Sequence, residues 1–331
     1  MKATIISFFA AFAVSLAVHA QQITVVTQYG ITSLFTDLNL AIQSAQAGSA
    51  IYLSGGGFQV NDTTKITKKL TIIGIGHRPD NDNADGNTNV SGNFFFNGGS
   101  DGSAVMGLWL SGNVNVGTAD AAVNNFLLRY CNVNSVQVGN SNCQGVLVNQ
   151  NYLRNMSSGG NSPVLFSNNI LFSIYYLNGG VINHNVIRER IGDSTSGWGK
   201  SAQGEVINCE IKNNICFYTD YWWTTNCTFD SNMALPGVGG VGDNSIAVGN
   251  DWENVFEGNY SGVNPNDNYA LKAGAPGKNA ATDGTDVGIY GGAGFSDTAL
   301  PPGPRIVSKK IAEQTDANGN LPVEITVSVQ Q

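Results

Sequence analysis

One short pattern recurs along the middle of the chain and constrains the fold more than any other feature. An apolar residue is followed by two variable residues, an asparagine and another apolar residue, as in Val148-Asn149-Gln150-Asn151-Tyr152. Six of the eight intervals between successive asparagines of the pattern fall between 16 and 20 residues, which is typical of a solenoid. Asn132 fits the pattern although Arg129 replaces its upstream apolar residue. The asparagines are Asn93, Asn113, Asn132, Asn151, Asn169, Asn185, Asn214, Asn232 and Asn259.

Short strands joined by tight turns at this period predict one coil of a parallel β-helix for each repeat. The apolar side chains five and three residues before each asparagine should point inward, because side chains alternate along a strand. Asparagine suits the bend, because it tolerates left-handed backbone angles. Asparagines stacked in register can also hydrogen-bond to those above and below them. We therefore expect a structural ladder of these asparagines that carries no chemistry.

The composition excludes several other classes of protein. The 331 residues are 42% hydrophobic but only 12% charged, whereas long helical bundles are rich in charged helix formers. The apolar content is too high for a disordered chain. The net charge of −8 provides no basic surface, so no nucleic-acid partner is expected.

Residues 1–20 have the features of a cleaved signal peptide. Lys2 supplies the positive start, residues 5–18 are almost uniformly apolar, and Val18-His19-Ala20 places small residues before the cleavage point. A membrane anchor is the alternative, but the apolar run is shorter than the roughly 18 residues that a membrane span needs. No later segment is long enough to span a bilayer. The sequence therefore predicts a protein that is secreted or displayed at the cell surface.

The β-helix domain is predicted over residues 21–299, and its N-terminal end should be covered by a helix. Leu34, Leu38, Ala41, Ile42 and Ala45 form one helical stripe, which predicts a capping α-helix that begins near Ser33 and ends near Gly48. Strands are expected to follow at residues 50–53 and 64–75. Residues 300–331 begin with a break at three prolines, and a terminal strand pair is expected at residues 306–311 and 323–329.

Two segments resemble a known group of proteins. Gly48-Ser49-Ala50-Ile51-Tyr52-Leu53, followed by Gly56-Gly57-Phe58, resembles the opening of secreted right-handed parallel β-helix proteins of the pectin-lyase-like superfamily. Residues 269–280 and 286–292 resemble the closing coil of exported bacterial members. The resemblance covers about residues 21–294 and implies an all-β fold, a right-handed parallel β-helix. It says little about activity, because one fold hosts many functions.

Many members of this superfamily are polysaccharide lyases, hydrolases or epimerases. Pectate lyases carry clustered Asp ligands for Ca²⁺ and arginine-bearing motifs, which this sequence does not show. Polygalacturonase-type hydrolases carry paired Asp residues and a Gly-His-Gly element, which are also missing. His184 directly precedes Asn185, so an outward structural position is favoured for it over a catalytic one.

The best functional candidate is a group of aromatic and charged residues near the long interval between Asn185 and Asn214. Stacked coils should bring these residues to one flank, where flat rings and polar groups can bind a sugar. The alternative, weighed equally, is a small satellite core with a solvated ion-pair network. The predicted carbohydrate contacts are Tyr175, Tyr176, Trp198, Tyr221, Trp222 and Trp223. In a lyase, the candidate catalytic residues would be Arg188 or Arg190 as the base, with Asp193 or Asp220 nearby.

The sequence gives only weak indications of a metal site or a disulfide. Residues 80–86 are similar to a calcium loop, but one inserted residue breaks the spacing, so a polar turn is favoured over a Ca²⁺ site and no cofactor is expected. Cys209 and Cys227 lie 18 residues apart and should stack in adjacent coils. Free core thiols are favoured slightly over a disulfide. The lack of a Cys-x-x-Cys pair argues against structural zinc.

These patterns together predict a secreted β-helix protein that binds extracellular carbohydrate and has no recognisable catalytic centre. A polysaccharide lyase or other carbohydrate-active enzyme is the first alternative. A structural surface or adhesion protein is the second. The sequence leaves the glycan and the oligomeric state open.

Overall fold

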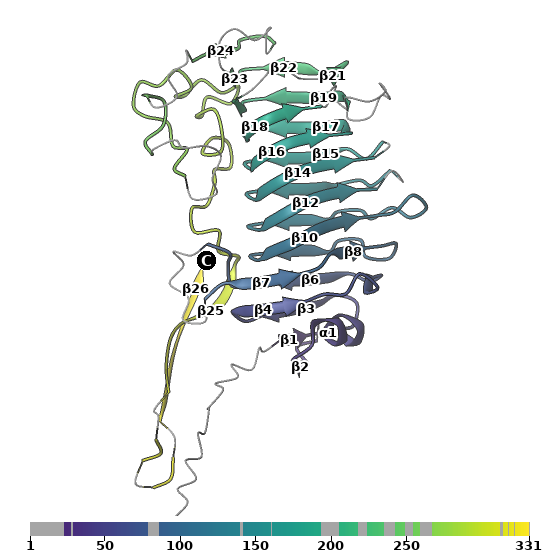
Figure 1. Cartoon of the computed structure of the whole chain (residues 1–331), viewed down its shortest axis with the longest axis vertical. Helices are drawn as coiled ribbons and strands as arrows, with labels where there is room; N and C mark the ends of the chain where they lie inside the picture. The colour runs from purple at the N-terminus through teal and green to yellow at the C-terminus, as the bar shows by residue number, and fades with distance from the viewer. Residues whose placement is uncertain are drawn as a thin grey trace, which may run out of the picture.

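The chain winds into a parallel β-solenoid, whose successive coils stack along one axis (Figure 1). The computed structural model describes residues 23–27, 29–78, 86–139, 142–159, 161–192, 205–217, 224–234, 242–248, 254–258, 267–311, 314–316, 318–320 and 322–330. The predicted signal peptide lies outside these ranges. Strands from successive coils pair in parallel within two 12-stranded sheets, here sheet A and sheet B, so the predicted parallel β-helix is confirmed.

The strands of each sheet come from alternating parts of the chain. Sheet A contains β1 (Ile23–Val26), β2 (Thr32–Phe35), β3 (Ser49–Leu53), β6 (Leu70–Ile73), β9 (Ala104–Met106), β11 (Leu127–Arg129), β13 (Val146–Asn149), β15 (Val164–Ser167), β17 (Asn178–Asn183), β19 (Val206–Lys212), β21 (Thr224–Thr225) and β22 (Thr228–Asp230). Sheet B contains β4 (Gly56–Gln59), β5 (Lys65–Ile66), β7 (Thr88–Ser91), β8 (Phe94–Phe96), β10 (Trp109–Val116), β12 (Asn132–Val138), β14 (Tyr152–Ser158), β16 (Ile170–Tyr175), β18 (Val186–Ile191), β20 (Ile215–Cys216), β23 (Met233–Ala234) and β24 (Ile246–Ala247).

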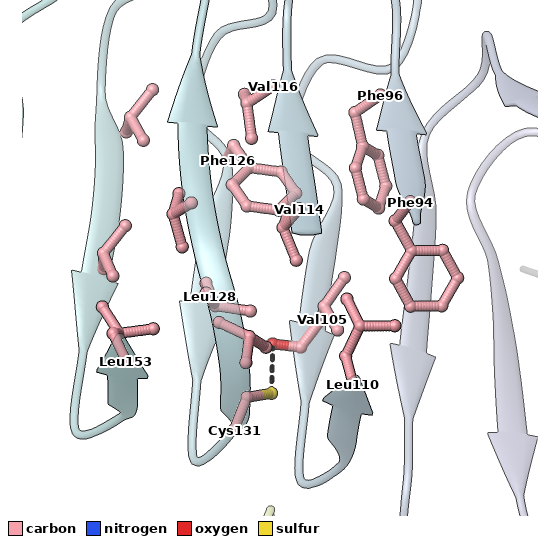
Figure 2. Close-up of a cluster of buried hydrophobic side chains, with 14 of the residues drawn as sticks. Phe94, Phe96, Val105, Leu110, Val114, Val116, Phe126, Leu128, Cys131 and Leu153 are labelled. Carbon is pink, nitrogen blue, oxygen red and sulfur yellow. Dashed lines mark hydrogen bonds between the residues drawn. The ribbon is translucent and has the colours of Figure 1, made fainter. Parts of the chain in front are cut away.

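The core runs along the solenoid axis and consists of inward side chains from both sheets. Figure 2 shows Val105 and Leu128 of sheet A facing Val114 and Val116 of sheet B across this interior. The ring centroids of Phe96 and Phe126 lie 4.8 Å apart in the same core. Full burial of one such side chain contributes about 1.5–3 kcal/mol, so the stack is stabilised mainly by these columns.

The N-terminal helix is shorter than the apolar stripe predicts. Helix α1 (Leu38–Ser44) begins after Asp37, whose carboxylate accepts a hydrogen bond from the backbone N–H of Leu40 at 2.9 Å. Leu34 is not part of the helix, because β2 pairs antiparallel with β1 and takes residues 32–35 into sheet A. The predicted strand over residues 64–75 is also divided, since β5 belongs to sheet B and β6 to sheet A.

Five of the repeat asparagines form one continuous buried column at the bend between the sheets. The Asn151 backbone N–H donates to Oδ1 of Asn169 at 2.9 Å, and the Asn169 N–H donates to Oδ1 of Asn185, also at 2.9 Å. The amide Nδ2 of Asn185 donates to the backbone carbonyls of Phe166 and Asn183, each at 3.0 Å. The same pattern continues through the remaining members. This ladder consists of Asn151, Asn169, Asn185, Asn214 and Asn232.

The other predicted ladder members lie elsewhere. Asn132 pairs with Trp109 in sheet B, so Cys131 takes the ladder position of its coil and its N–H donates to Oδ1 of Asn151 at 2.9 Å. Asn93 and Asn113 form a separate contact at the bend inside sheet B, where a register shift in β10 lies between Leu110 and Asn113. Asn259 lies outside the described residues. The single predicted column was wrong for Asn93 and Asn113, which lie at another bend, and for Asn132, which lies one residue past the ladder position.

The left-handed residue at each bend is the one before the ladder asparagine. Asn168, His184 and Asn213 have φ values of 53°, 54° and 57°. The left-handed residue reverses the chain, and the asparagine that follows is then free to direct its amide toward buried backbone groups. The prediction that the ladder asparagines themselves adopt this conformation was therefore wrong by one residue.

The stability of the stack should depend on the buried ladder. Asn185→Ala removes the acceptor of the Asn169 N–H and the donor for two carbonyls. Because an unsatisfied buried polar group costs about 1–3 kcal/mol, we expect a loss of at least about 2 kcal/mol in urea unfolding.

Asn178→Ala is the matched control, because Asn178 also stacks between asparagines, Asn161 and Asn208, but on a solvated column. Water can replace those partners, so we expect a change of less than about 0.5 kcal/mol. Equal losses for the two variants would contradict a special role for the buried ladder.

After the last coil, a closing segment (residues 267–300) turns back along the flank of the solenoid. Gly288 donates its N–H to the Asn213 carbonyl at 2.8 Å, and Asn168 Nδ2 donates to the carbonyls of Ile289 and Gly291. Gly288 has φ +88°, and a Cβ there would lie 2.4 Å from Cδ1 of Ile215, so glycine is required at this close approach. Figure 1 shows this segment beside the stack.

Beyond the closing segment, β25 (Gly303–Ile311) pairs antiparallel with β26 (Val323–Gln330). Figure 1 shows this hairpin extending past the N-terminal end of the solenoid. Within the described part of the chain, no helix combines the length and apolar character needed to cross a bilayer.

Candidate functional site

A cavity of about 660 Å³ opens on the outer face of sheet B, next to the N-terminal helix. Its walls come from the residues that precede and begin α1, from β4 and β7, and from the start of β10. We call it the Trp109 groove. The residues used below are Asp37, Asn39, Gln59, Asn89, Trp109 and Ser111.

The indole of Trp109 is the main apolar surface of this groove. The side chain lies on the outer face of β10 and is 49% exposed. Such exposure is unusual for tryptophan. Gln59, Asn89 and Ser111 are exposed beside it. Among the described residues, no hydrogen bond occupies the side chains of Gln59, Asn89 or Ser111. The groove thus offers a flat ring beside amide and hydroxyl groups that are available to a ligand.

The wall beside α1 is held in place by a buried amide. Asn39 Nδ2 donates to the Gln59 carbonyl at 3.2 Å, and its Oδ1 accepts from the Asn61 N–H at 2.8 Å and the Thr64 hydroxyl at 2.7 Å. These bonds tie the helix to β4 and to the turn that follows. Asp37 is the one charged side chain in the described lining, and its carboxylate already caps the helix.

The groove lies at the lower end of a longer outward column of sheet B. Asn89, Trp109, Asn132 and Tyr152 are paired in register, one from each successive coil. Beyond Tyr152 the same column becomes apolar and fully buried. Its members there are Ile170, Val186, Ile215 and Met233.

The closing segment explains this change of character. Tyr269 and Leu271 of this segment, together with Val255 and Phe256 earlier in the chain, form a second hydrophobic cluster with the apolar half of the column. Tyr152 lies at the boundary, where its ring contacts Phe172 edge to face with centroids 6.4 Å apart. Burial raises the pKa of Tyr152, although nearby arginines oppose the shift, so its hydroxyl stays protonated at neutral pH. The column is therefore covered in one half and open in the other.

The predicted aromatic flank is only partly within the described residues. Tyr175 is half-buried in β16, and Tyr176 has φ 55° and a 45% exposed side chain. Tyr176 lines a second cavity of about 330 Å³ with Asn115, Gln137 and Ser157, and Asn115 lies in β10, six residues after Trp109. Outside the described residues lie Asp193, Trp198, Asp220, Tyr221, Trp222 and Trp223.

Both candidate lyase bases belong to β18. The guanidinium of Arg188 lies 5.0 Å from the centroid of the Phe172 ring, which is a cation–π contact. Arg190 belongs to β18 and pairs with Ser173. Burial, followed by the charge of Arg78, lowers the pKa of His77 to about 3, so His77 is uncharged at neutral pH.

His184 holds the closing segment. Its side chain is buried, with Nδ1 3.2 Å from the Gly288 carbonyl and Nε2 3.1 Å from Oδ2 of Asp283. Both neighbours are hydrogen-bond acceptors, and the tautomer of the ring decides which nitrogen donates to them. Burial disfavours ionisation of Asp283, but hydrogen bonds from Thr285 and His184 outweigh it and lower the pKa of this carboxyl. This contact therefore stabilises the segment at neutral pH and weakens as the pH falls below about 4.

Replacement of His184 should loosen the closing segment without unfolding the coils. In His184→Ala we expect faster amide hydrogen exchange at Gly288 and Gly292, because the two ring contacts are lost. Exchange in β13 and β15 should stay as slow as in the native chain.

His184→Asn is the control for the bend, because asparagine also tolerates the left-handed conformation but is too short to reach Asp283. It should exchange as fast as His184→Ala in the closing segment. Native exchange rates in both variants would show that His184 does not anchor this segment.

Sequence reasoning missed Trp109. The asparagine repeat makes Asn113 equivalent to Asn132, which puts Trp109 four residues before that position and out of line with Tyr152. The structure aligns Trp109 with Asn132 directly. An aromatic residue at an outward strand position was the available signal, but the column could not be recognised from the wrong register.

Within the described residues, no group of three or more His, Cys, Asp or Glu side chains is placed to hold a metal ion. The calcium-like residues 80–85 lie outside the described ranges. Comparison with protein-family models gives no match, and comparison with curated proteins gives no significant match.

Proposed function

We propose that this protein is secreted, that it is a right-handed β-helix of the pectin-lyase-like type, and that it binds extracellular carbohydrate in the Trp109 groove. The observation that carries the proposal is the half-exposed indole beside three polar side chains with no partners among the described residues. Sugar rings have apolar faces that stack on aromatic rings and hydroxyls that bond to amides, so the two surfaces are complementary.

The open column above the groove supports an extended glycan that lies along the solenoid axis. Amide and aromatic side chains alternate from coil to coil, in the order Asn89, Trp109, Asn132 and Tyr152. The two aromatic residues are two coils apart, which is about 9.6 Å at the usual strand spacing. That distance suits a polymer in which every second sugar ring presents the same face.

The charge of the groove favours an uncharged glycan. Its one described charged side chain, Asp37, is occupied by the helix N-terminus. An acidic polymer would meet no arginine or lysine among the described lining residues, and the net charge of −8 would repel it.

Two other functions remain as alternatives. A polysaccharide lyase would use Arg188 or Arg190, and it would release unsaturated uronate that absorbs in the ultraviolet. A structural or adhesion protein would bind none of the sugars on a glycan array. The aromatic flank around Tyr176, Trp222 and Trp223 is a second candidate surface for carbohydrate.

Trp109→Ala should weaken glycan binding by about tenfold or more, equivalent to about 1.4 kcal/mol, because the main stacking surface is removed. The measurement is retention on a glycan array, followed by titration with the best ligand. Trp109 is on the outer face of β10, so the variant should keep the native unfolding midpoint.

Tyr176→Ala is the matched control, because Tyr176 has a similar exposure but lines the other cavity. If Tyr176→Ala or the double variant Trp222→Ala/Trp223→Ala loses binding while Trp109→Ala keeps it, the site is the aromatic flank. Absence of any retained glycan would contradict carbohydrate binding altogether.

A further inference from the structure

Two cysteines stack at the C-terminal end of sheet A, far along the solenoid from the Trp109 groove. In the register of sheet A, Gly180 pairs with Cys209, and Glu210 pairs with Thr228. Cys209 and Cys227 therefore occupy equivalent positions in neighbouring coils. The backbone N–H of Cys209 donates to Sγ of Cys227 at 3.4 Å, and both thiols are free.

The two thiols differ in accessibility. Cys209 is 3% exposed beneath its neighbour, whereas Cys227 is only partly buried. Cys227 directly precedes β22, the last strand of sheet A in the described chain, and beyond β22 the described residues add one isolated bridge, Asp230 to Asp243. A small reagent can thus reach Cys227 from the end of the stack, while the other cysteines, Cys131, Cys143 and Cys216, are fully buried.

The contact between the thiols also separates their acidities. The hydrogen bond from Cys209 lowers the pKa of Cys227 to about 7, with burial opposing this shift and the backbone N–H of Cys209 adding to it. The same hydrogen bond, together with burial, raises the pKa of Cys209. A thiolate is the nucleophilic form of cysteine, so at neutral pH Cys227 is the reactive member of the pair.

We propose that Cys227 and Cys209 form a reactive dithiol site, in which Cys227 attacks a low-molecular-weight disulfide and Cys209 then closes an intramolecular disulfide. This inference is independent of carbohydrate binding. The parallel strand spacing of about 4.8 Å lies within the Cα separation of roughly 4.4–6.8 Å that a disulfide accepts.

The two steps balance as a thiol–disulfide exchange. First, the Cys227 thiolate forms a bond to one sulfur of the reagent, whose S–S bond breaks and releases one thiolate. Second, the Cys209 thiol gives its proton to water and its sulfur attacks Cys227, which releases the second reagent thiolate. The two cysteines lose two electrons and two protons, and the reagent disulfide is reduced to two thiols.

The test uses the native full-length chain and oxidised glutathione at pH 7. We expect the intact mass to fall by two hydrogen atoms, and peptide mapping to show a Cys209–Cys227 crosslink. Cys209→Ser should instead keep one glutathione on Cys227, because no resolving thiol is present. Cys216→Ser, the matched control at a fully buried cysteine, should react like the native chain.

A second measurement uses the native chain alone, so it does not depend on the variants folding. Alkylation of Cys227 by iodoacetamide should reach half its maximal rate near pH 7, whereas an unperturbed cysteine does so near about 8.5. The proposal is overturned by an unmodified chain after glutathione treatment, or by a stable glutathione adduct on the native protein. Labelling of Cys216 as fast as Cys227 would overturn it too.

Discussion

The structure depends on how the backbone N–H and carbonyl groups at the bend between the two sheets find hydrogen-bond partners. The chain turns there in every coil, and the turn buries N–H and carbonyl groups that neither sheet can pair. Between β13 and β23, each ladder asparagine supplies an acceptor for the coil below and a donor for a carbonyl of that coil. The ladder asparagines from Asn151 to Asn214 also donate to a carbonyl of their own coil. A buried polar group without a partner is costly, so these amides fix both the shape of the bend and the register of the coils. The apolar columns in Figure 2 can stack only because that register is kept.

The same register determines where a ligand can bind. Outward side chains at equivalent positions of sheet B stack from coil to coil. The column that contains Trp109 therefore has one half that is apolar and buried and one half that is open. The second hydrophobic cluster covers this column from Ile170 onward, and Tyr152 lies at its edge. Trp109, two coils before Tyr152, is left uncovered. It lies beside the hydrogen bond by which Asn39 ties α1 to β4. The groove is thus a consequence of where the hydrophobic cover over this column ends as much as of the residues that line it.

The sequence was sufficient for the parts of the fold that repeat. The spacing of the asparagines predicts the parallel solenoid, and the spacing of Cys209 and Cys227 predicts their stacking in neighbouring coils. It was insufficient where one coil differs from the next. Asn132 pairs with Tyr152 and so lies one residue past the ladder position, and β2 shortened the helix by pairing with β1. The sequence also did not reveal the Trp109 groove, because the groove is formed with residues from other coils whose register could not be predicted.

The closing segment also changes how the solenoid responds to stress. In a simple repeat array each coil contacts only its neighbours, so the ends fray one coil at a time. Here the segment contacts Asn213, His184, Asn168 and Gln150 in turn, and Pro301 packs against Gly107 of a much earlier coil. This one segment therefore connects coils that lie far apart along the solenoid axis. Loss of a single coil would break contacts along the whole segment, so these coils should unfold together. A nascent chain could complete these contacts only after residues 267–301 were synthesised.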